Sequence, residues 1–384
     1  MTYNHKVETG SLYLHWPFCP YRCHFCPFIA LAGHDEYVQR YHDSLCKEVE
    51  RFAQLCVPEH EIDTIFIGGG TPSTWPDKLL LDMFDKLKGI FVIKRSAEIS
   101  IEVNPGTVRE EQLSLWADIG INRLSIGVQS LNDAVLKKVN RLQKAEDVLH
   151  LLKKAKEKFE NISVDLILGL PEVSDNEWKQ VIEKVVHWPI KHISIYFLSV
   201  HKKTKLFYGV QSGTVHLPSE ERLVDLYNWS VDFLAKNGFE RYEVSNFAKP
   251  GYECRHNEVY WERLPYKGFG LGACSFDGNV RFKNHANLMD YLEGTQKCEN
   301  VEGFSEKLTK DQVRLEKLML GLRRPKGVSY VQIFENLSQE KKEALKRKLA
   351  LLEERKIICK KDGRIFLDSS SFVIENEVVL ELLV

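Results

Sequence analysis

What the sequence lacks defines its broad class. Its opening residues, MTYNHKVETG, hold no apolar run of the kind a signal peptide needs, and no later stretch is apolar enough to span a bilayer. Lysine and arginine (53) nearly balance aspartate and glutamate (54), so no net field attracts nucleic acid. Nine cysteines are an odd number for 384 residues, which argues against a disulfide framework. We therefore expect a cytoplasmic protein with reduced thiols and no nucleic-acid partner.

Short β-branched runs alternate with longer amphipathic segments up to about residue 200. Apolar strands that are separated by helices predict βαβ units with a parallel sheet. Six units in series favour a barrel or partial barrel, in which the chemistry lies at the carboxyl ends of the strands. The expected strands are 12–18, 62–69, 98–105, 123–130, 162–171 and 192–200.

The pattern changes after about residue 215. A glycine- and aromatic-rich stretch, 256–278, is expected to be irregular, and charged helices follow from about residue 305. Two strand-like runs joined at Asp362–Gly363 complete what resembles a small winged-helix-like domain. We therefore predict three domains, namely a barrel at 1–235, an α+β extension at 236–304 and a C-terminal helical domain with a terminal hairpin at 305–384.

Three cysteines lie close together directly after the first strand. Cys19, Cys23 and Cys26 have the spacing C-x3-C-x2-C, and Phe28 stands where a fourth cysteine might follow. Structural zinc needs four ligands, so His15 or His24 would have to complete the set. An iron–sulfur cluster held by three thiolates instead leaves one iron open to a small chelating substrate. Isolated cysteines, such as Cys46 and Cys359, are expected to be small buried hydrophobes.

The cysteine motif, with an aromatic residue (Phe25) before its last cysteine, resembles the cluster motif of the radical S-adenosylmethionine (SAM) enzymes. That resemblance implies a partial (β/α)6 radical SAM barrel. It also implies a [4Fe–4S] cluster that is held by Cys19, Cys23 and Cys26, with the open iron binding the amino and carboxylate groups of SAM.

Further motifs, between about residues 11 and 300, resemble those of the oxygen-independent coproporphyrinogen III dehydrogenase group. They are YLHWPFC, GGGTPS, IEVNP, RLSIGVQS, VNR and VDLILGLP, in that order. On physical grounds, glycines offer unhindered N–H groups to a ligand, and a carboxylate at the end of a strand can bind ribose hydroxyls or an ammonium group. The resemblance implies that the SAM site is lined by Tyr13, Phe25, Gly69, Gly70, Thr71, Glu102, Gln129, Arg141 and Asp165.

Two departures argue against the dehydrogenase reaction itself. Members of that group carry a cysteine at the position of Phe28, and they have a longer arm before the motif than the eighteen residues that precede Cys19 here. The segment 256–261, with the pattern H-N-x-x-Y-W, resembles instead the heme chaperone (HemW-type) lineage.

The residues of this pattern suit a heme site. A neutral imidazole, His256, can ligate iron, and Asn257 can orient it. Tyr260 and Trp261 offer flat apolar faces to a macrocycle. Cys254 and His285 are rival iron ligands.

We therefore predict a radical SAM [4Fe–4S] heme chaperone that transfers heme to acceptors such as respiratory cytochromes. It would need an electron donor, and it would touch membranes only peripherally, through those acceptors. The alternatives are a coproporphyrinogen III dehydrogenase, another radical SAM tetrapyrrole enzyme, or a metal-stabilised barrel without redox chemistry.

Overall fold

A computed structural model describes residues 9–55 and 61–384 of the chain. Its centre is a parallel sheet in which six strands pair in chain order, and each of them overlaps a strand predicted from the sequence. The prediction of six β-α units is therefore confirmed. The six strands are β1 (Ser11–Trp16), β4 (Glu61–Gly69), β5 (Val92–Val103), β6 (Arg123–Gln129), β7 (Asn161–Leu168) and β8 (His192–Phe197).

Three short strands extend this sheet at its two ends. β11 (Lys267–Phe269) pairs in parallel with β1, although it lies far along the chain. β10 (Asn246–Ala248) pairs antiparallel with β8 and is followed outward by β9 (Glu240–Arg241). Among the described residues β11 and β9 are not paired with each other, so the barrel is partial, as predicted.

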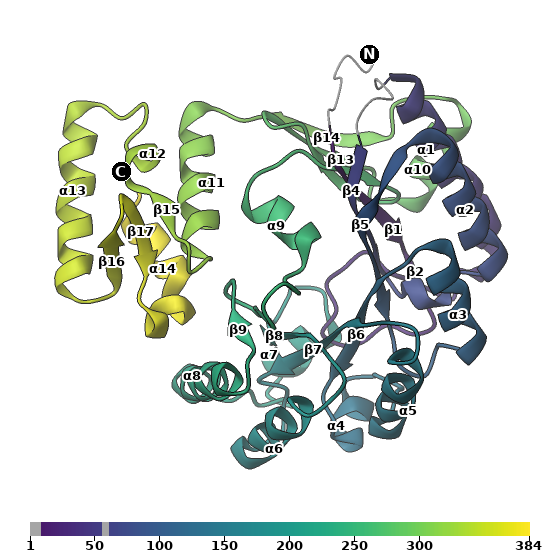
Figure 1. Cartoon of the computed structure of the whole chain (residues 1–384), viewed down its shortest axis with the longest axis horizontal. Helices are drawn as coiled ribbons and strands as arrows, with labels where there is room; N and C mark the ends of the chain where they lie inside the picture. Colours follow the sequence, from purple (N-terminus) through teal and green to yellow (C-terminus); the bar gives the residue numbers. More distant parts are fainter. Residues whose placement is uncertain (1–8, 56–60) are drawn as a thin grey trace.

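Helices cover the outer face of the sheet because each crossover carries an apolar stripe (Figure 1). Helix α6 shows how the sequence sets a helix start. Ser174 Oγ accepts the N–H of Glu177, and the Glu177 side chain accepts the N–H of Ser174. The helices are α1 (Val38–Leu55), α2 (Asp77–Ile90), α3 (Glu110–Ile119), α4 (Asp133–Lys138), α5 (Ala145–Ala155), α6 (Asp175–Val185), α7 (Lys205–Gln211) and α8 (Glu220–Lys236).

The stretch expected to be irregular is more regular than the sequence indicated. Its first residues form helix α9 (Arg255–Trp261), and strands β11 and β12 (Cys274–Phe276) follow. β12 pairs with β13 (Val280–Asn284), and β13 pairs with β14 (Glu302–Lys307), to form a second sheet beside helix α10 (Leu288–Gln296). The expectation of an irregular segment is therefore wrong. The many glycines and aromatics here serve tight packing rather than loop structure, since a Cβ on Gly268 would lie 2.1 Å from the carbonyl oxygen of Cys274.

The C-terminal residues have a hydrophobic core of their own, which includes Leu318, Leu345 and Ile365. The predicted hairpin is present, with Asp362 and Gly363 at φ 50° and 70° in its turn. The boundaries of the three domains stay a prediction. The elements here are α11 (Lys310–Leu322), β15 (Val328–Ser329), α12 (Tyr330–Ile333), α13 (Gln339–Glu354), β16 (Ile358–Lys361), β17 (Arg364–Leu367) and α14 (Glu375–Glu381).

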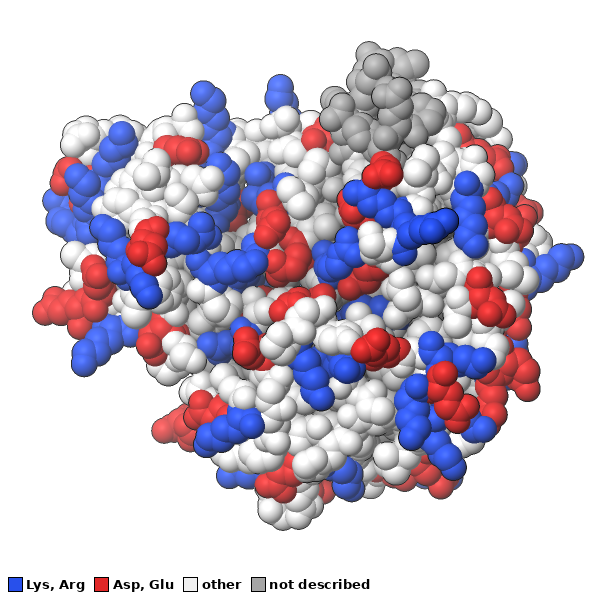
Figure 2. All heavy atoms as spheres, in the orientation of Figure 1, with Lys and Arg blue, Asp and Glu red and all other residues white. Residues whose placement is uncertain are grey.

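The surface mixes charges of both signs. On the face drawn in Figure 2, basic and acidic side chains are interspersed over the barrel and the C-terminal elements. None of the helices in the described ranges has the length and apolar character needed to cross a bilayer.

Candidate functional site

A cavity of about 410 Å³ lies at the carboxyl ends of the central strands. Cys19, Cys23 and Cys26 line it together. Cys19 ends the short strand β2 (Phe18–Cys19), and the other two lie in the loop that follows. Tyr13 is the only predicted SAM residue that does not line it. The predicted SAM residues in the cavity wall are Phe25, Gly69, Gly70, Thr71, Glu102, Gln129, Arg141 and Asp165.

The segment that carries the three cysteines, residues 19–26, is called the cysteine loop. Hydrogen bonds to its backbone hold it against the barrel. His24 N–H donates to the carbonyl of Val139 at 2.9 Å, and the His24 carbonyl accepts from Leu206 N–H at 3.0 Å. Asn140 Nδ2 donates to the carbonyl of Arg22 at 2.8 Å. The loop is therefore positioned by the segments after α4 and β8, independently of any cluster.

The three thiols suit iron–sulfur ligation. All are half-buried, and none is in a disulfide. Burial raises the pKa of Cys19 to about 11, although the Thr71 hydroxyl donates to its sulfur at 3.2 Å and lowers it. The Arg141 guanidinium lies 3.9 Å from the Cys23 sulfur. The added positive charge of iron would complete the deprotonation, so these residues fit a cluster.

The zinc alternative lacks a fourth ligand in this geometry. Both ring nitrogens of His15 are engaged, Nδ1 with the Tyr13 hydroxyl at 3.0 Å and Nε2 with the Ile29 carbonyl at 3.2 Å. His24 Nδ1 contacts the Lys138 carbonyl at 3.0 Å. Neither imidazole lines the cavity. A closed set of three cysteines and one of these histidines is therefore not formed.

The glycines at the end of β4, Gly69 and Gly70, make other contacts than the ones expected. The N–H of Gly69 donates to Glu102 Oε2 at 3.0 Å, and the N–H of Gly70 donates to the carbonyl of Trp16 at 2.7 Å. A Cβ on Gly70 would lie 2.4 Å from the carbonyl oxygen of Pro17. The expectation of free N–H groups is therefore wrong. These glycines let the end of β4 approach the start of the cysteine loop.

Two carboxyl groups lie on the inner wall of the cavity. Burial raises the pKa of Glu102 to about 7, opposed by the hydrogen bond from Gly69 and reinforced by the nearby charge of Asp165. Burial also raises the pKa of Asp165, whose Oδ2 accepts from Ser125 at 3.2 Å. The other carboxyl oxygen of Asp165 has no hydrogen-bond partner within the described part of the chain. It is therefore available to a ligand.

A bulge at the end of β6 brings two further polar groups to the wall. The register with β7 shifts between Gly127 and Gln129, and Gln129 adopts a positive φ of 65°. Arg141 Nη2 donates to the Gly127 carbonyl at 2.6 Å, and Arg141 Nε donates to Gln143 Oε1 at 2.8 Å. The guanidinium is thus held in one orientation between the cysteine loop and the bulge.

The mouth of the cavity includes residues that sequence reasoning missed. Asn104 Nδ2 donates to the Tyr21 hydroxyl at 2.9 Å, which ties the end of β5 to the cysteine loop. Tyr196, within β8, and the exposed His201, after β8, also line the cavity. Their position at the end of the sixth predicted strand was the one available signal. Phe28, which occupies the place of a fourth cysteine, lines the mouth and is 66% exposed.

A second, smaller chamber of about 240 Å³ lies deeper in the barrel. It shares Glu102, Ser125, Asp165 and Tyr196 with the cavity above it. Strands β6 and β8 begin with Arg123 and His192, so the chamber extends toward their amino-terminal ends. Tyr13 and three residues of the H-N-x-x-Y-W pattern, His256, Asn257 and Tyr260, complete its wall.

His256 is completely buried in this chamber's wall, with both ring nitrogens in hydrogen bonds. Nδ1 lies 2.8 Å from the Thr64 hydroxyl, and Nε2 lies 2.8 Å from the Tyr260 hydroxyl. Burial lowers the pKa of His256 to about 3, so the ring is neutral. In this arrangement neither nitrogen is free to ligate iron. Helix α9, which carries His256, closes the barrel toward the amino-terminal ends of the strands.

The other residues proposed for heme contact are dispersed. Cys254 is buried, with its thiol 3.6 Å from Glu98 Oε1. The Trp261 ring faces Arg323, 5.6 Å from its centroid, and it lines neither chamber. His285 lies between β13 and α10, outside both chambers. The heme roles of these residues stay predictions.

Comparison with known proteins defines the class and then the family. Residues 13–185 match the Radical SAM superfamily, so the chain carries a radical SAM domain. The solved structure of coproporphyrinogen III oxidase (HemN) from Escherichia coli shares the fold, with a TM-score of 0.85 at 23% identity over 99% of this chain and 91% of that one.

Similarity to heme chaperones extends over nearly the full length. The heme chaperone HemW of Lactococcus lactis is 34% identical, covering 97% of this chain and 96% of that protein. HemW of Synechocystis is 37% identical over 84% and 80% of the two chains. The mouse mitochondrial radical S-adenosyl methionine domain-containing protein 1 is 31% identical over 94% and 86%. The chain belongs to the HemW family of heme chaperones, a membership that implies a [4Fe–4S] cluster and SAM as cofactors.

Proposed function

We propose that this chain binds heme and passes it to acceptor proteins, respiratory cytochromes among them, in the cytoplasm. The observation that carries the proposal is its similarity to heme chaperones over 97% of its length. Contact with membranes would arise only through membrane-bound acceptors, and an external donor would reduce the cluster.

The cavity wall suggests how SAM would be held. A cluster of this kind supplies one-electron reduction of SAM and an open iron that binds its amino acid part. Glu102 and Asp165 would accept hydrogen bonds from ribose hydroxyls or the ammonium group, with Gln129 beside them. Arg141, fixed by Gly127 and Gln143, would balance the negative charge of the cluster thiolates.

We place heme at the mouth of the same cavity. Phe28 and Tyr196 line this cavity and are 66% and 43% exposed, so their rings offer apolar faces to a macrocycle. His201 is an exposed imidazole in the same wall and would hold the heme iron. His256, by contrast, would have to give up two hydrogen bonds and leave the core before it could bind iron.

An anaerobic turnover assay tests the chaperone proposal against the enzymatic alternative. The cluster is reconstituted and reduced, and SAM and coproporphyrinogen III are added. We expect SAM to bind and the tetrapyrrole to be recovered unchanged. Formation of protoporphyrinogen together with deoxyadenosine over many turnovers would show that the chain is a dehydrogenase after all.

A further inference from the structure

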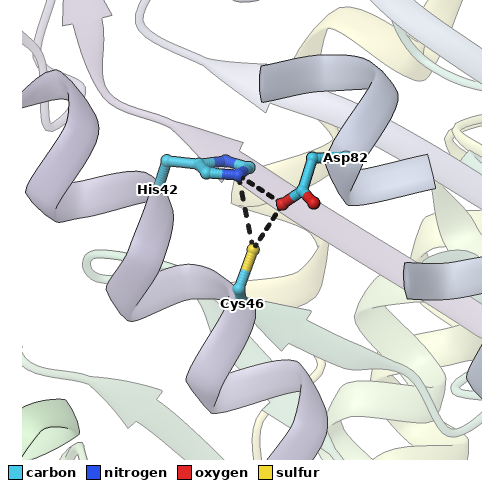
Figure 3. Close-up of side chains that lie close together, drawn as sticks. All are labelled: His42, Cys46 and Asp82. Carbon is cyan, nitrogen blue, oxygen red and sulfur yellow. Dashed lines mark hydrogen bonds and ion pairs between the residues drawn. The ribbon is translucent and has the colours of Figure 1, made fainter. Parts of the chain in front are cut away.

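A cluster of metal-ligating side chains lies outside the cavity, between helices α1 and α2. His42 and Cys46 are one helical turn apart on α1, and Asp82 faces them from α2 (Figure 3). His42 Nε2 is 2.9 Å from Asp82 Oδ2, Cys46 Sγ is 3.5 Å from the same nitrogen, and Cys46 Sγ is 3.6 Å from Asp82 Oδ2. Three different donor atoms therefore converge on one point.

The arrangement is not that of a catalytic cysteine. In such a site the histidine uses one ring nitrogen for the thiol and the other for the orienting carboxylate. Here Nε2 makes both contacts, and Nδ1 has no hydrogen-bond partner in the described part of the protein. Burial and the neighbouring Asp82 raise the pKa of Cys46 to about 12, so the thiol is not activated.

The spacing of the three atoms matches the ligands of a tetrahedral metal ion. Bond lengths of about 2.3 Å to sulfur and about 2.05 Å to nitrogen or oxygen place a sulfur about 3.6 Å from the other two ligands, and those two about 3.3 Å apart. The two observed sulfur distances agree with this geometry, and the contact between nitrogen and oxygen needs to open by about 0.4 Å. A pair of ligands at i and i+4 on one helix is a recurrent basis for zinc sites.

We propose that His42, Cys46 and Asp82 form a zinc site that links α1 to α2. A mixed sulfur, nitrogen and oxygen set suits Zn²⁺ better than the hard cations Mg²⁺ or Ca²⁺. On binding, the Cys46 proton is released to solvent and its sulfur bonds the ion. His42 and Cys46 are buried, but the Asp82 side chain is 53% exposed, so solvent reaches the site and a water completes the tetrahedron.

The surroundings limit the strength of the site. With zinc on Nε2, the ring proton of His42 moves to Nδ1, where the described residues provide no acceptor. Affinity is therefore expected to be lower than at a closed site with four protein ligands. The ion would still stabilise the folded chain, because it joins two helices that cover the sheet (Figure 1).

The test uses the full chain with its cluster loaded, so that Cys19, Cys23 and Cys26 are occupied. Equilibrium dialysis against Zn²⁺, followed by elemental analysis, counts bound zinc. The informative variant is Asp82→Asn, since the exposed carboxylate can change without disturbing the core. Asp85→Asn, an exposed aspartate on the same helix, is the matched control.

We expect one zinc per wild-type chain and the same in Asp85→Asn, and at least about a tenfold loss of affinity in Asp82→Asn. Zinc should also raise the melting temperature of wild type and Asp85→Asn more than that of Asp82→Asn. Failure of the wild type to retain zinc would overturn the proposal. Equal zinc binding by both variants would overturn it too, because the ion would then lie elsewhere.

Discussion

The two ends of the barrel carry similar side chains in opposite settings. At the carboxyl end, thiols, carboxylates and an imidazole line an open cavity whose mouth exposes Phe28 and His201. Toward the other end, His256 and Tyr260 are hydrogen-bonded to each other inside a small polar chamber. In the sequence both ends carry motifs that look functional, although His201 belongs to none of them. The comparison teaches that long-range packing decides whether a histidine near aromatics keeps a ring nitrogen free for a metal.

The largest expected effect is the loss of the cluster at the carboxyl end of the barrel. Cys23→Ser removes one of three thiolates, and two thiolates cannot retain a cubane cluster, so most cluster iron and sulfide should be lost. Iron and sulfide analysis after anaerobic reconstitution measures this. Cys298→Ser, an exposed cysteine outside the cavity, is the control and should retain the full content. A Cys23→Ser protein with full iron content would refute the cluster assignment.

At the other end of the barrel, where His256 is buried, we expect substitutions to change the free energy of unfolding and not the binding of heme. His256→Ala leaves the hydroxyls of Thr64 and Tyr260 without their partner and opens a cavity, which should cost about 2–4 kcal/mol of unfolding free energy. His285→Ala, with a half-buried ring outside both chambers, should cost less than about 1 kcal/mol. Urea unfolding measures both.

The Soret band of heme-loaded protein distinguishes the two ends directly. We expect it to shift in His201→Ala and to stay unchanged in His256→Ala. A shift in the His256 variant alone would support the sequence-based assignment and place heme on α9.

Helix α9 is also held from its outer side. Arg324 binds Glu258 and, at 3.0 Å, Glu262, and it is nearly buried between the C-terminal elements and α9. Arg324→Ala leaves Glu262 without this cation and Glu258 with only Lys326 at 3.8 Å, and it should cost about 1–3 kcal/mol. Arg355→Ala breaks a pair with Glu381 that is exposed to solvent, so its cost should stay below about 1 kcal/mol. Equal costs in urea unfolding would mean that the contact with Arg324 does not secure α9.

The smallest expected effect is the pH dependence of SAM affinity. Glu102 has a pKa of about 7, raised first by burial and further by Asp165. Because a cationic ligand favours the ionised carboxylate, binding must release the proton that Glu102 carries below this pH. SAM affinity should therefore rise with pH between about pH 5.5 and pH 8, by at most about tenfold per unit.

Titration of SAM into cluster-loaded protein measures this rise. Glu102→Gln cannot ionise, so its affinity should be lower at high pH and nearly independent of pH, with the cluster intact. A parallel loss of cluster and SAM would make Glu102 a structural residue instead.

The sequence predicted the open end well for a physical reason. Parallel strands place their carboxyl ends together, so Cys19, Gly69, Glu102 and Asp165 meet whatever the loops do. It did not predict the features that long-range packing decides. Nothing local shows that β11 adds to β1, that α9 closes the barrel, or that Thr64 occupies the second nitrogen of His256. His201 was missed because an exposed histidine after a strand carries no motif.

Heme transfer tests the central claim most directly. Heme-loaded, cluster-bearing protein is mixed anaerobically with an excess of an apo-cytochrome, and the Soret bands of the two proteins are followed over time. We predict that heme leaves this chain and appears in the cytochrome, and that His201→Ala holds less heme from the start. Heme that stays bound, or that reaches the acceptor no faster than free heme does, would contradict the account.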